Sequence, residues 1–328
     1  MTFYNDIYPF YHVQRTSFIF NLALLTVILV FVVFAIIFLL ILPGIRGKSR
    51  LFWMCRVLIS LFIGAVIVAV NFTSDWAAAS MKANTTYKSF SSGIVNAEIG
   101  LHVGLSGINV TLKGNPVMQL NETIDYNEMF KWTDSLDEDY TEALERGLPN
   151  PILYIAEKFT AGSPCGLYFQ YRYSGTYASA TMWTAFCCWL VANVLFSMPV
   201  ILYAGFMMVA TAAFIFFSLA SFSTIQNLPA CVFAIGTASF EMGYSHSFWL
   251  ALAIGVLCVV IGLLVILLDC LIPEKMKEAF SVDVDDEDDD NCLTEGYLNS
   301  NFLEGVTTIT FTGNKTTEDA SDKLTLQS

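Results

Sequence analysis

Long apolar stretches dominate the pattern of hydrophobic and polar positions along the chain. A helix of roughly 20 apolar residues is long enough to cross about 30 Å of hydrocarbon. The first stretch is longer than the core of a secretory signal and no small-residue cleavage site follows it, so we expect it to be retained. The pattern therefore predicts five membrane-spanning helices, at Phe18–Leu42, Val57–Ala77, Ala178–Val200, Leu202–Phe222 and Phe248–Leu268.

The segment 78–177, between the second and third spans, has a different pattern. Apolar residues alternate with polar ones from Ile94 to Leu105 and again from Ile108 to Leu112. This alternation is typical of antiparallel strands that are buried on one face. We expect tight turns at Ser106-Gly107 and at Lys113–Pro116, where the alternation is interrupted.

Two helices are predicted to follow these strands. The first covers Thr133–Arg146, where Thr133 or Asp134 can cap the start and Gly147 stands at the favoured C-terminal position. The second opens at Asn150-Pro151, with Asn150 as its cap and proline at the first helical position. The sequence thus predicts a membrane α-helical protein with a small outer α+β domain.

A basic loop, 43–56, determines the predicted orientation. It carries four cations and no acid, at Arg46, Lys48, Arg50 and Arg56. Basic residues in short loops beside spans stay in the cytosol. Alternation then places 1–17, 78–177 and 223–247 outside, and the acidic tail 269–328 in the cytosol, where its charge predicts disorder.

Sites for N-glycosylation are an independent check on this orientation. The pattern Asn-x-Ser/Thr occurs at Asn84, Asn109 and Asn121, all in the large outer segment. The same pattern at Asn71 falls at the membrane edge and at Asn314 in the cytosolic tail, so we expect both to be silent. Three sequons in one outer segment agree with the charge rule.

Composition and missing chemistry exclude several functional classes. The chain is 55% hydrophobic, as in an integral membrane protein, and its net charge of −13 argues against nucleic acid as a partner. All three histidines lie outside the predicted hydrocarbon, and no zinc spacing, phosphate-binding loop or GxSxG motif is present. Ionisable residues are nearly absent from the spans, which disfavours a transporter or channel. We therefore expect no enzymatic activity, no cofactor, no metal and no small-molecule substrate.

Two of the eight cysteines, Cys165 and Cys231, fall in the predicted oxidising space. They can pair with each other, bridge to a partner chain or stay free, and the residues alone leave these alternatives open. Small-residue spacings at Ser60-xxx-Gly64, Ala65-xxx-Ala69 and Ala251-xxx-Gly255 suit close helix packing. Packing within the chain's own bundle is the favoured interpretation, and a docking face for another protein's spans is the alternative.

Several segments resemble the dual oxidase maturation factors. They run in order from residue 8 to about 200 and include Tyr8-Pro-Phe-Tyr11, Ile41-Leu-Pro-Gly-Ile-Arg-Gly47, Gln119–Asn127, Ala143–Pro149, Pro151–Thr160 and Ser163-Pro-Cys-Gly-Leu-Tyr168. The fourth and fifth spans resemble the family mainly in length and hydropathy, and the tail shows no family pattern.

The resemblance implies five spans, with a claudin-like bundle of four preceded by an extra N-terminal span. It implies a heterodimer with a dual oxidase, which leaves the endoplasmic reticulum for the plasma membrane and releases hydrogen peroxide that supports thyroid hormone synthesis. The positions Cys165 and Cys231 match cysteines that are candidates for bridging to the oxidase. The GLW motif and the loop cysteine pair of a claudin are absent. A claudin-like adhesion or barrier protein is the alternative function.

Overall fold

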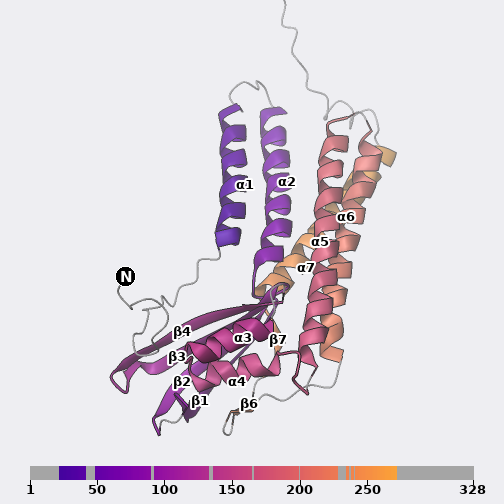
Figure 1. Cartoon of the computed structure of the whole chain (residues 1–328). Coiled ribbons are helices and arrows are strands. Elements are labelled where there is room, and N and C mark those ends of the chain that lie inside the picture. The colour runs from indigo at the N-terminus through magenta and orange to yellow at the C-terminus, as the bar shows by residue number, and fades with distance from the viewer. Residues whose placement is uncertain are drawn as a thin grey trace, which may run out of the picture. The chain divides into compact units, whose positions relative to one another are not determined.

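The computed structural model of the chain describes residues 22–41, 49–89, 92–132, 136–164, 166–198, 200–227, 234–235, 238–239 and 241–271. Within them lie five helices long and apolar enough to cross a membrane, together with a small antiparallel sheet, as the sequence predicts (Figure 1). The five are α1 (Leu22–Ile41), α2 (Ser49–Phe72), α5 (Leu167–Phe196), α6 (Ile201–Ser223) and α7 (His246–Leu271).

Helices α5, α6 and α7 pack closely because small residues lie where they cross. A Cβ atom on Gly205 of α6 would lie 3.2 Å from the carbonyl oxygen of Gly262 on α7, and one on Gly262 would lie 3.0 Å from that of Gly205. Between α5 and α6, the Ser218 hydroxyl donates to the Ala178 carbonyl at 2.9 Å. Close approach of backbones through small residues and interhelical hydrogen bonds is how helices associate in lipid.

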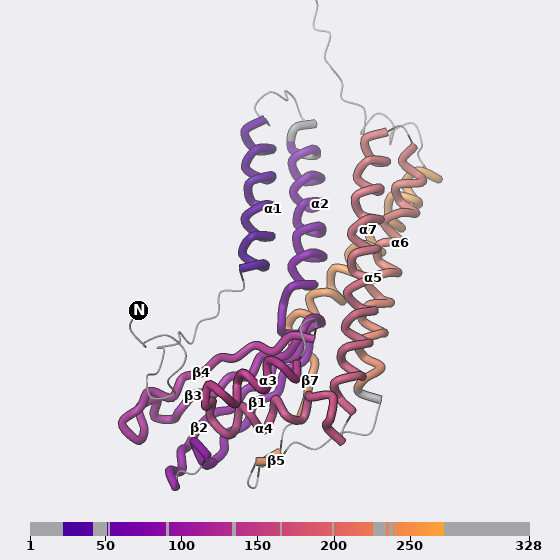
Figure 2. Tube along the Cα trace, in the orientation of Figure 1, coloured from indigo at the N-terminus to yellow at the C-terminus, as the bar shows by residue number. Residues whose placement is uncertain are grey.

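The helix α1 is packed quite differently. It contacts α2, and none of its residues is buried. Its sequence is apolar all round, with no glycine and only two alanines, 12 positions apart, so no small-residue face is available for a close helix crossing. In the tube of Figure 2, α1 and α2 run side by side.

The sheet has five strands in the order β4-β3-β2-β1-β7. The first four are consecutive hairpins and the fifth is contributed by the second outer loop, just before α7. Their bounds are β1 (Ala77–Thr86), β2 (Ile94–Val103), β3 (Gly107–Gln119), β4 (Glu122–Lys131) and β7 (Gly243–Tyr244). A separate two-stranded pairing joins β5 (Ala234–Ile235) to β6 (Ala238–Ser239), after the 3-10 helix η2 (Thr224–Asn227).

One face of the sheet is covered by α3 (Leu136–Glu145) and α4 (Asn150–Lys158). Alternate strand residues point into this layer and form a core of fully buried side chains, which includes Ile99, Leu101, Ile108, Leu112 and Ile124 from the sheet and Ile152, Ile155 and Phe159 from the helical side. The alternation that predicted the strands is therefore the alternation of burial.

Two local expectations are corrected by the structure. Lys113–Pro116 is an irregular stretch inside β3, where the register with β4 shifts, and the turn comes later, at Leu120 and Asn121. Asn150 does not cap α4, since it is already helical and Pro149 takes the cap position. The Asn150 side chain instead accepts a hydrogen bond of 2.7 Å from the Ser89 hydroxyl.

Other local expectations are confirmed. The turn at Ser106-Gly107 joins β2 to β3, and Gly147 closes α3 with a φ of +67°, a conformation that glycine adopts without strain. Thr133 and Asp134, proposed as caps for α3, lie outside the described residues.

Candidate partner-binding surfaces

The outer sheet is attached to α2 by Trp76, whose side chain is fully buried. Its indole N–H donates to the Val70 carbonyl at 3.0 Å, and its backbone N–H donates to the Val103 carbonyl at 3.0 Å. The ring packs on Phe222 of α6 and Phe248 of α7, with centroids 5.2 and 6.3 Å away. One residue thus ties the sheet to three spans.

The start of α7 is joined to the same linker between α2 and β1. The Ser245 backbone N–H donates to the Trp76 carbonyl at 3.0 Å, and that of Ser247 donates to the Asp75 carbonyl at 3.2 Å. A hydroxyl pair, Thr73 to Ser247, adds a bond of 2.7 Å. These bonds explain why β7 pairs with β1, because they hold the chain alongside β1 just before α7 begins.

An ion pair lies at this junction. The Nδ1 atom of His102 lies 2.7 Å from a carboxylate oxygen of Asp75, and both side chains are partly exposed. The hydrogen bond from His102 is the main reason that the pKa of Asp75 falls below its ordinary value, and the nearby charges of His102 and His246 act in the same direction. Desolvation opposes this shift. Both histidines in the described part of the chain therefore gather around one carboxylate.

A second attachment joins the outer helices to α5. Trp132 stacks on Tyr171 of α5 with an angle of 8° between the rings and also contacts Phe159 and Tyr168. Close by, Gly175 of α5 lies against the β2–β3 turn, where an added Cβ would come 2.5 Å from the Leu105 carbonyl oxygen. Only glycine permits this approach without a shift of the backbone. The outer domain and the spans are therefore packed as one hydrophobic core.

The face of the sheet opposite α3 and α4 is polar and uncovered by these helices. Register brings His102 beside Asn109, Gly100 beside Thr111, and Glu98 beside Lys113 on this open face. The predicted glycosylation sites Asn84 and Asn109 both lie on it, Asn84 exposed and Asn109 half-buried. Asn121 is exposed in the β3–β4 turn with a φ of +61°. Occupancy of these three sites stays a prediction.

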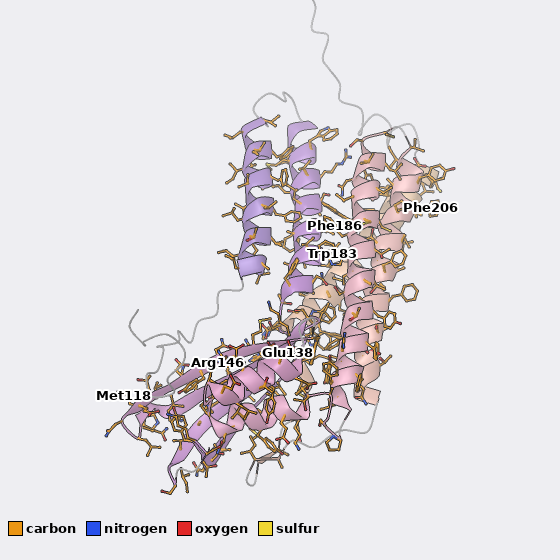
Figure 3. All side chains as sticks on the ribbon, in the orientation of Figure 1. Met118, Glu138, Arg146, Trp183, Phe186 and Phe206 are labelled. Carbon is orange, nitrogen blue, oxygen red and sulfur yellow. The ribbon has the colours of Figure 1, made fainter. Side chains whose placement is uncertain are left out.

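The far tips of the β1–β2 and β3–β4 hairpins carry exposed apolar side chains. Ile94 is 67% exposed, Met118 69% and Leu120 53%; Figure 3 shows Met118 at the end of the sheet. The Gln119 side chain joins the two hairpins through bonds of 2.8 and 3.1 Å to the backbone of Asn96. We call Ile94, Met118 and Leu120 the tip patch. Their number at the two tips makes these side chains a candidate protein contact site.

Most of the predicted small-residue spacings are used inside the chain. Ser60 donates a hydrogen bond to Asn193, and Gly64 lies against the Trp189 ring, where a Cβ would clash at 2.5 Å. Gly255 packs in the same way on Phe216 of α6. The third spacing, Ala65-xxx-Ala69, remains partly exposed. It is the small-residue surface among these three that another protein's spans can still reach.

The other predicted site residues are distributed as follows. Cys165, Cys231, Arg46 and Lys48 lie outside the described residues, and Arg50 is in the first turn of α2. Arg56 lies in α2 with its guanidinium over the rings of Trp53 and Phe196. Within the residues that the structure describes, no three His, Cys, Asp or Glu side chains are grouped as metal ligands would be.

Comparison with known proteins identifies the family. The family model for dual oxidase maturation factors matches residues 10–284 of the chain. The chain belongs to the dual oxidase maturation factor family. It is 51% identical to dual oxidase maturation factor 2 of Mus musculus over 290 residues, which is 87% of this chain and 90% of that protein. It is 48% identical to dual oxidase maturation factor 1 of Homo sapiens over 283 residues, 85% of this chain and 82% of that protein.

The elements that attach the outer domain of this family member were not found from its sequence. Trp76 and Trp132 sit in short links between elements, where periodicity carries no signal. The Asp75–His102 pair joins residues 27 positions apart, and only strand register brings them together. The small-residue spacings named from the sequence did not include Gly175, Gly205 or Gly262, and a glycine inside an apolar helix is the signal that could have found them.

Proposed function

We propose that this chain is a non-enzymatic maturation factor that forms a heterodimer with a dual oxidase. The names of its relatives support this, since they are called dual oxidase maturation factors. The observation that carries the proposal is the fixed attachment of the outer domain to the spans, through Trp76 and Gly175. Such a protein presents an outer surface and a membrane surface in one set orientation, which suits a partner with both membrane and outer parts.

The proposed orientation follows the basic loop 43–56, which we place in the cytosol with the tail 269–328. The N-terminal segment 1–17, the outer domain 78–177 and the second outer loop 223–247 then face the lumen and, later, the cell exterior. The complex forms in the endoplasmic reticulum and moves to the plasma membrane, where the oxidase produces hydrogen peroxide. A claudin-like arrangement of α2, α5, α6 and α7 around the sheet belongs to this proposal.

The physical basis of maturation is mass action. An oxidase with many spans exposes unpaired apolar and polar surface when it is alone. A partner that binds the native form and not the unfolded form stabilises the native form by RT ln(1 + [L]/Kd). The stabilised oxidase passes quality control and leaves the endoplasmic reticulum. This role needs no catalytic group on the present chain.

The tip patch is the contact that we propose for the outer domain of the oxidase. Glycans on Asn84 and Asn109 would cover the open face of the sheet and leave the hairpin tips as the nearby apolar surface. In the membrane, we assign the oxidase spans to α1 and to the Ala65-xxx-Ala69 face, neither of which is fully buried within the chain. A disulfide from Cys165 or Cys231 to the oxidase is the covalent part of the proposal.

Co-expression with a dual oxidase tests the contact. Cells receive the oxidase with the wild-type chain or with a variant in which Ile94, Met118 and Leu120 are all changed to Glu. Charges at the tip patch oppose burial in an interface but stay solvated in the free chain. We expect surface oxidase and extracellular peroxide to fall at least fivefold, while the amount and thermal stability of the chain stay unchanged. A matched triple change on the open face, Ser80, Lys82 and Glu98 to Ala, serves as the control.

Full peroxide output from the tip-patch variant would refute this contact. Equal peroxide output with and without the wild-type chain would refute the maturation role and favour the adhesion function. Asn121 lies in the same turn, so Asn121→Gln is a separate arm and should leave pairing intact. A Cys165→Ser/Cys231→Ser variant tests the covalent part. Unchanged mass of the complex on non-reducing gels, with unchanged surface oxidase, would rule out the bridge.

A further inference from the structure

A cavity of about 300 Å³ lies within the membrane-spanning bundle, lined by residues of α2, α5, α6 and α7. It is at the end of the bundle away from the sheet. Arg56, which lines it, stands 16 residues before Phe72 at the sheet end of α2, and this is roughly 24 Å along a helix at 1.5 Å per residue. Its volume is at the lower limit of ligand pockets, which span roughly 300–1,000 Å³.

The walls of this cavity are mostly apolar. They are formed by Ile59, Ile63, Met208, Ile261, Leu264 and Val265. Such walls bind hydrocarbon by the hydrophobic effect and packing, and they provide no hydrogen-bond partner for a polar ligand. A site with these walls, open between helices in a membrane, suits an acyl chain of a lipid.

Polar groups are present at one level of the cavity. The Arg56 guanidinium carbon lies 4.6 Å from the centroid of the Trp53 ring and 5.6 Å from that of Phe196, which hold the cation against the wall. The residues that line the cavity include no acid. Basic pockets between spans on the cytosolic side are typical sites for anionic lipid headgroups. The charge therefore favours a phosphate at this level.

A buried donor deeper in the cavity points the same way. The Trp189 side chain is 6% exposed and lines the cavity, and its indole N–H has no hydrogen-bond partner within the described residues. The neighbouring amide of Asn193 is already engaged, donating to the Trp189 carbonyl at 2.8 Å and accepting from Ser60. Leaving a buried donor unpaired is costly, so a ligand that also carries acceptor oxygens is favoured over pure hydrocarbon.

We propose that this cavity binds one acyl chain of an anionic glycerophospholipid, with the lipid phosphate paired to Arg56. The acyl chain fills the space that α2, α5, α6 and α7 line. The inference rests on the proposed orientation in one respect, since it places the headgroup in the cytosolic leaflet, where anionic lipids concentrate.

Native mass spectrometry of the purified full chain in mild detergent tests this site. Three probes are compared: palmitoyl-oleoyl phosphatidylserine, the phosphatidylcholine with the same chains, and soluble glycerol 3-phosphate. We expect one tightly held phosphatidylserine, bound about fivefold more strongly than phosphatidylcholine. This ratio is the gain in affinity that one cation near an anionic headgroup provides, about 1 kcal/mol. Glycerol 3-phosphate should not bind, because it lacks the acyl chain. Because both lipids carry the phosphate and differ in net headgroup charge, equal retention of the two would overturn the preference for an anionic lipid at Arg56.

Variants separate the cavity from general attraction of lipid. Arg56→Gln should abolish the preference for phosphatidylserine, whereas Arg50→Gln, which removes the same charge six residues earlier in α2, should keep it. Val265→Phe should fill the cavity and reduce retention of both lipids to background, whereas Phe206→Leu, on an outward-facing side chain of α6 (Figure 3), should change neither. Thermal unfolding of each variant checks that it is folded.

Three results would overturn the proposal. An equal loss with Arg50→Gln would mean that the basic segment attracts lipid without a site. Full retention by a folded Val265→Phe would mean that lipid binds elsewhere on the bundle. Loss of the bound phosphatidylserine when the chain is purified together with a dual oxidase would mean that the cavity receives a helix of the partner.

Discussion

The helices α1 and α6 are both apolar enough to cross a membrane, and α1 is the more apolar of the two, but their surroundings are very different. No residue of α1 is buried, whereas α6 has buried residues along its whole length, from Ile201 to Phe222. The difference lies in residue size, because α6 contains Gly205 and Ala212 at its contacts and α1 is built of large aliphatic and aromatic side chains. Apolar character moves a helix into the membrane, and small residues decide whether another helix can approach it. We propose that the large unburied surface of α1 is one of the faces that a partner's spans contact, without the close backbone approach that small residues allow.

The outer domain resembles α6 in this comparison, because it too packs closely against the spans. Trp76→Ala should therefore have the largest effect. It removes a fully buried indole and its hydrogen bond to Val70, and we expect a loss of about 3–5 kcal/mol in the free energy of unfolding. Thermal unfolding in detergent measures it. The control is Trp249→Ala, which changes a tryptophan of α7 that is 57% exposed and should cost little.

The comparison of α1 and α6 is tested directly by a matched isoleucine pair. Ile215→Ala in α6 removes a side chain with no exposed surface and should destabilise the protein by about 2–5 kcal/mol. Ile37→Ala in α1, where the side chain is 48% exposed, should fall within about 0.5 kcal/mol of wild type. Equal losses in denaturant or thermal unfolding would show that α1 is packed against the chain as closely as α6.

The close contact between α5 and the sheet predicts an intermediate effect. Gly175→Ala places a methyl group against the Leu105 carbonyl, so one element must shift, at a cost of about 1–3 kcal/mol. Gly162→Ala meets no atom within 4 Å and serves as the control. Limited proteolysis of the outer domain, compared with the melting temperature, distinguishes a loosened junction from general unfolding. A Gly175→Ala protein that resists protease as well as wild type would contradict the tight junction.

The smallest effect is expected at the Asp75–His102 pair. Because the folded state lowers the pKa of Asp75, the pair contributes stability above the ordinary aspartate pKa of about 4, and this contribution is lost as pH falls through the lower folded value. Half of the Asp75 side chain is exposed, so screening limits the contribution to about 1 kcal/mol or less.

The measurement is the difference in melting temperature between wild type and Asp75→Asn across pH 3 to 7. The difference should be constant near neutral pH and shrink below about pH 4 as Asp75 takes up a proton. A difference that does not change with pH would mean that Asp75 acts through shape alone. Lys82→Ala, which removes a 3.9 Å pair with Glu98 on the exposed sheet surface, provides a comparison for solvated charge.

Much of this molecule follows from local pattern. Five apolar runs predicted the five long helices, and alternation from Ile94 to Leu112 predicted β2 and the first part of β3. The family segments, which extend from Tyr8 to Tyr168, led to the family that the comparisons show. These features are local because hydropathy and burial period are properties of consecutive residues. The orientation predicted from Arg46–Arg56 remains a prediction of the same local kind.

Tertiary structure decided the rest. Asn150 is of a residue type that often caps a helix, yet its side chain accepts a hydrogen bond from Ser89, 61 positions away. Register placed Asn84 and Asn109 on one open face, and the chain before α7 returned to add β7 to β1. The sequence by itself determined which segments enter the membrane and which family they belong to. Only the folded structure decided which small residues meet, as Gly205 meets Gly262, because a close approach depends on the positions of two distant backbones at once.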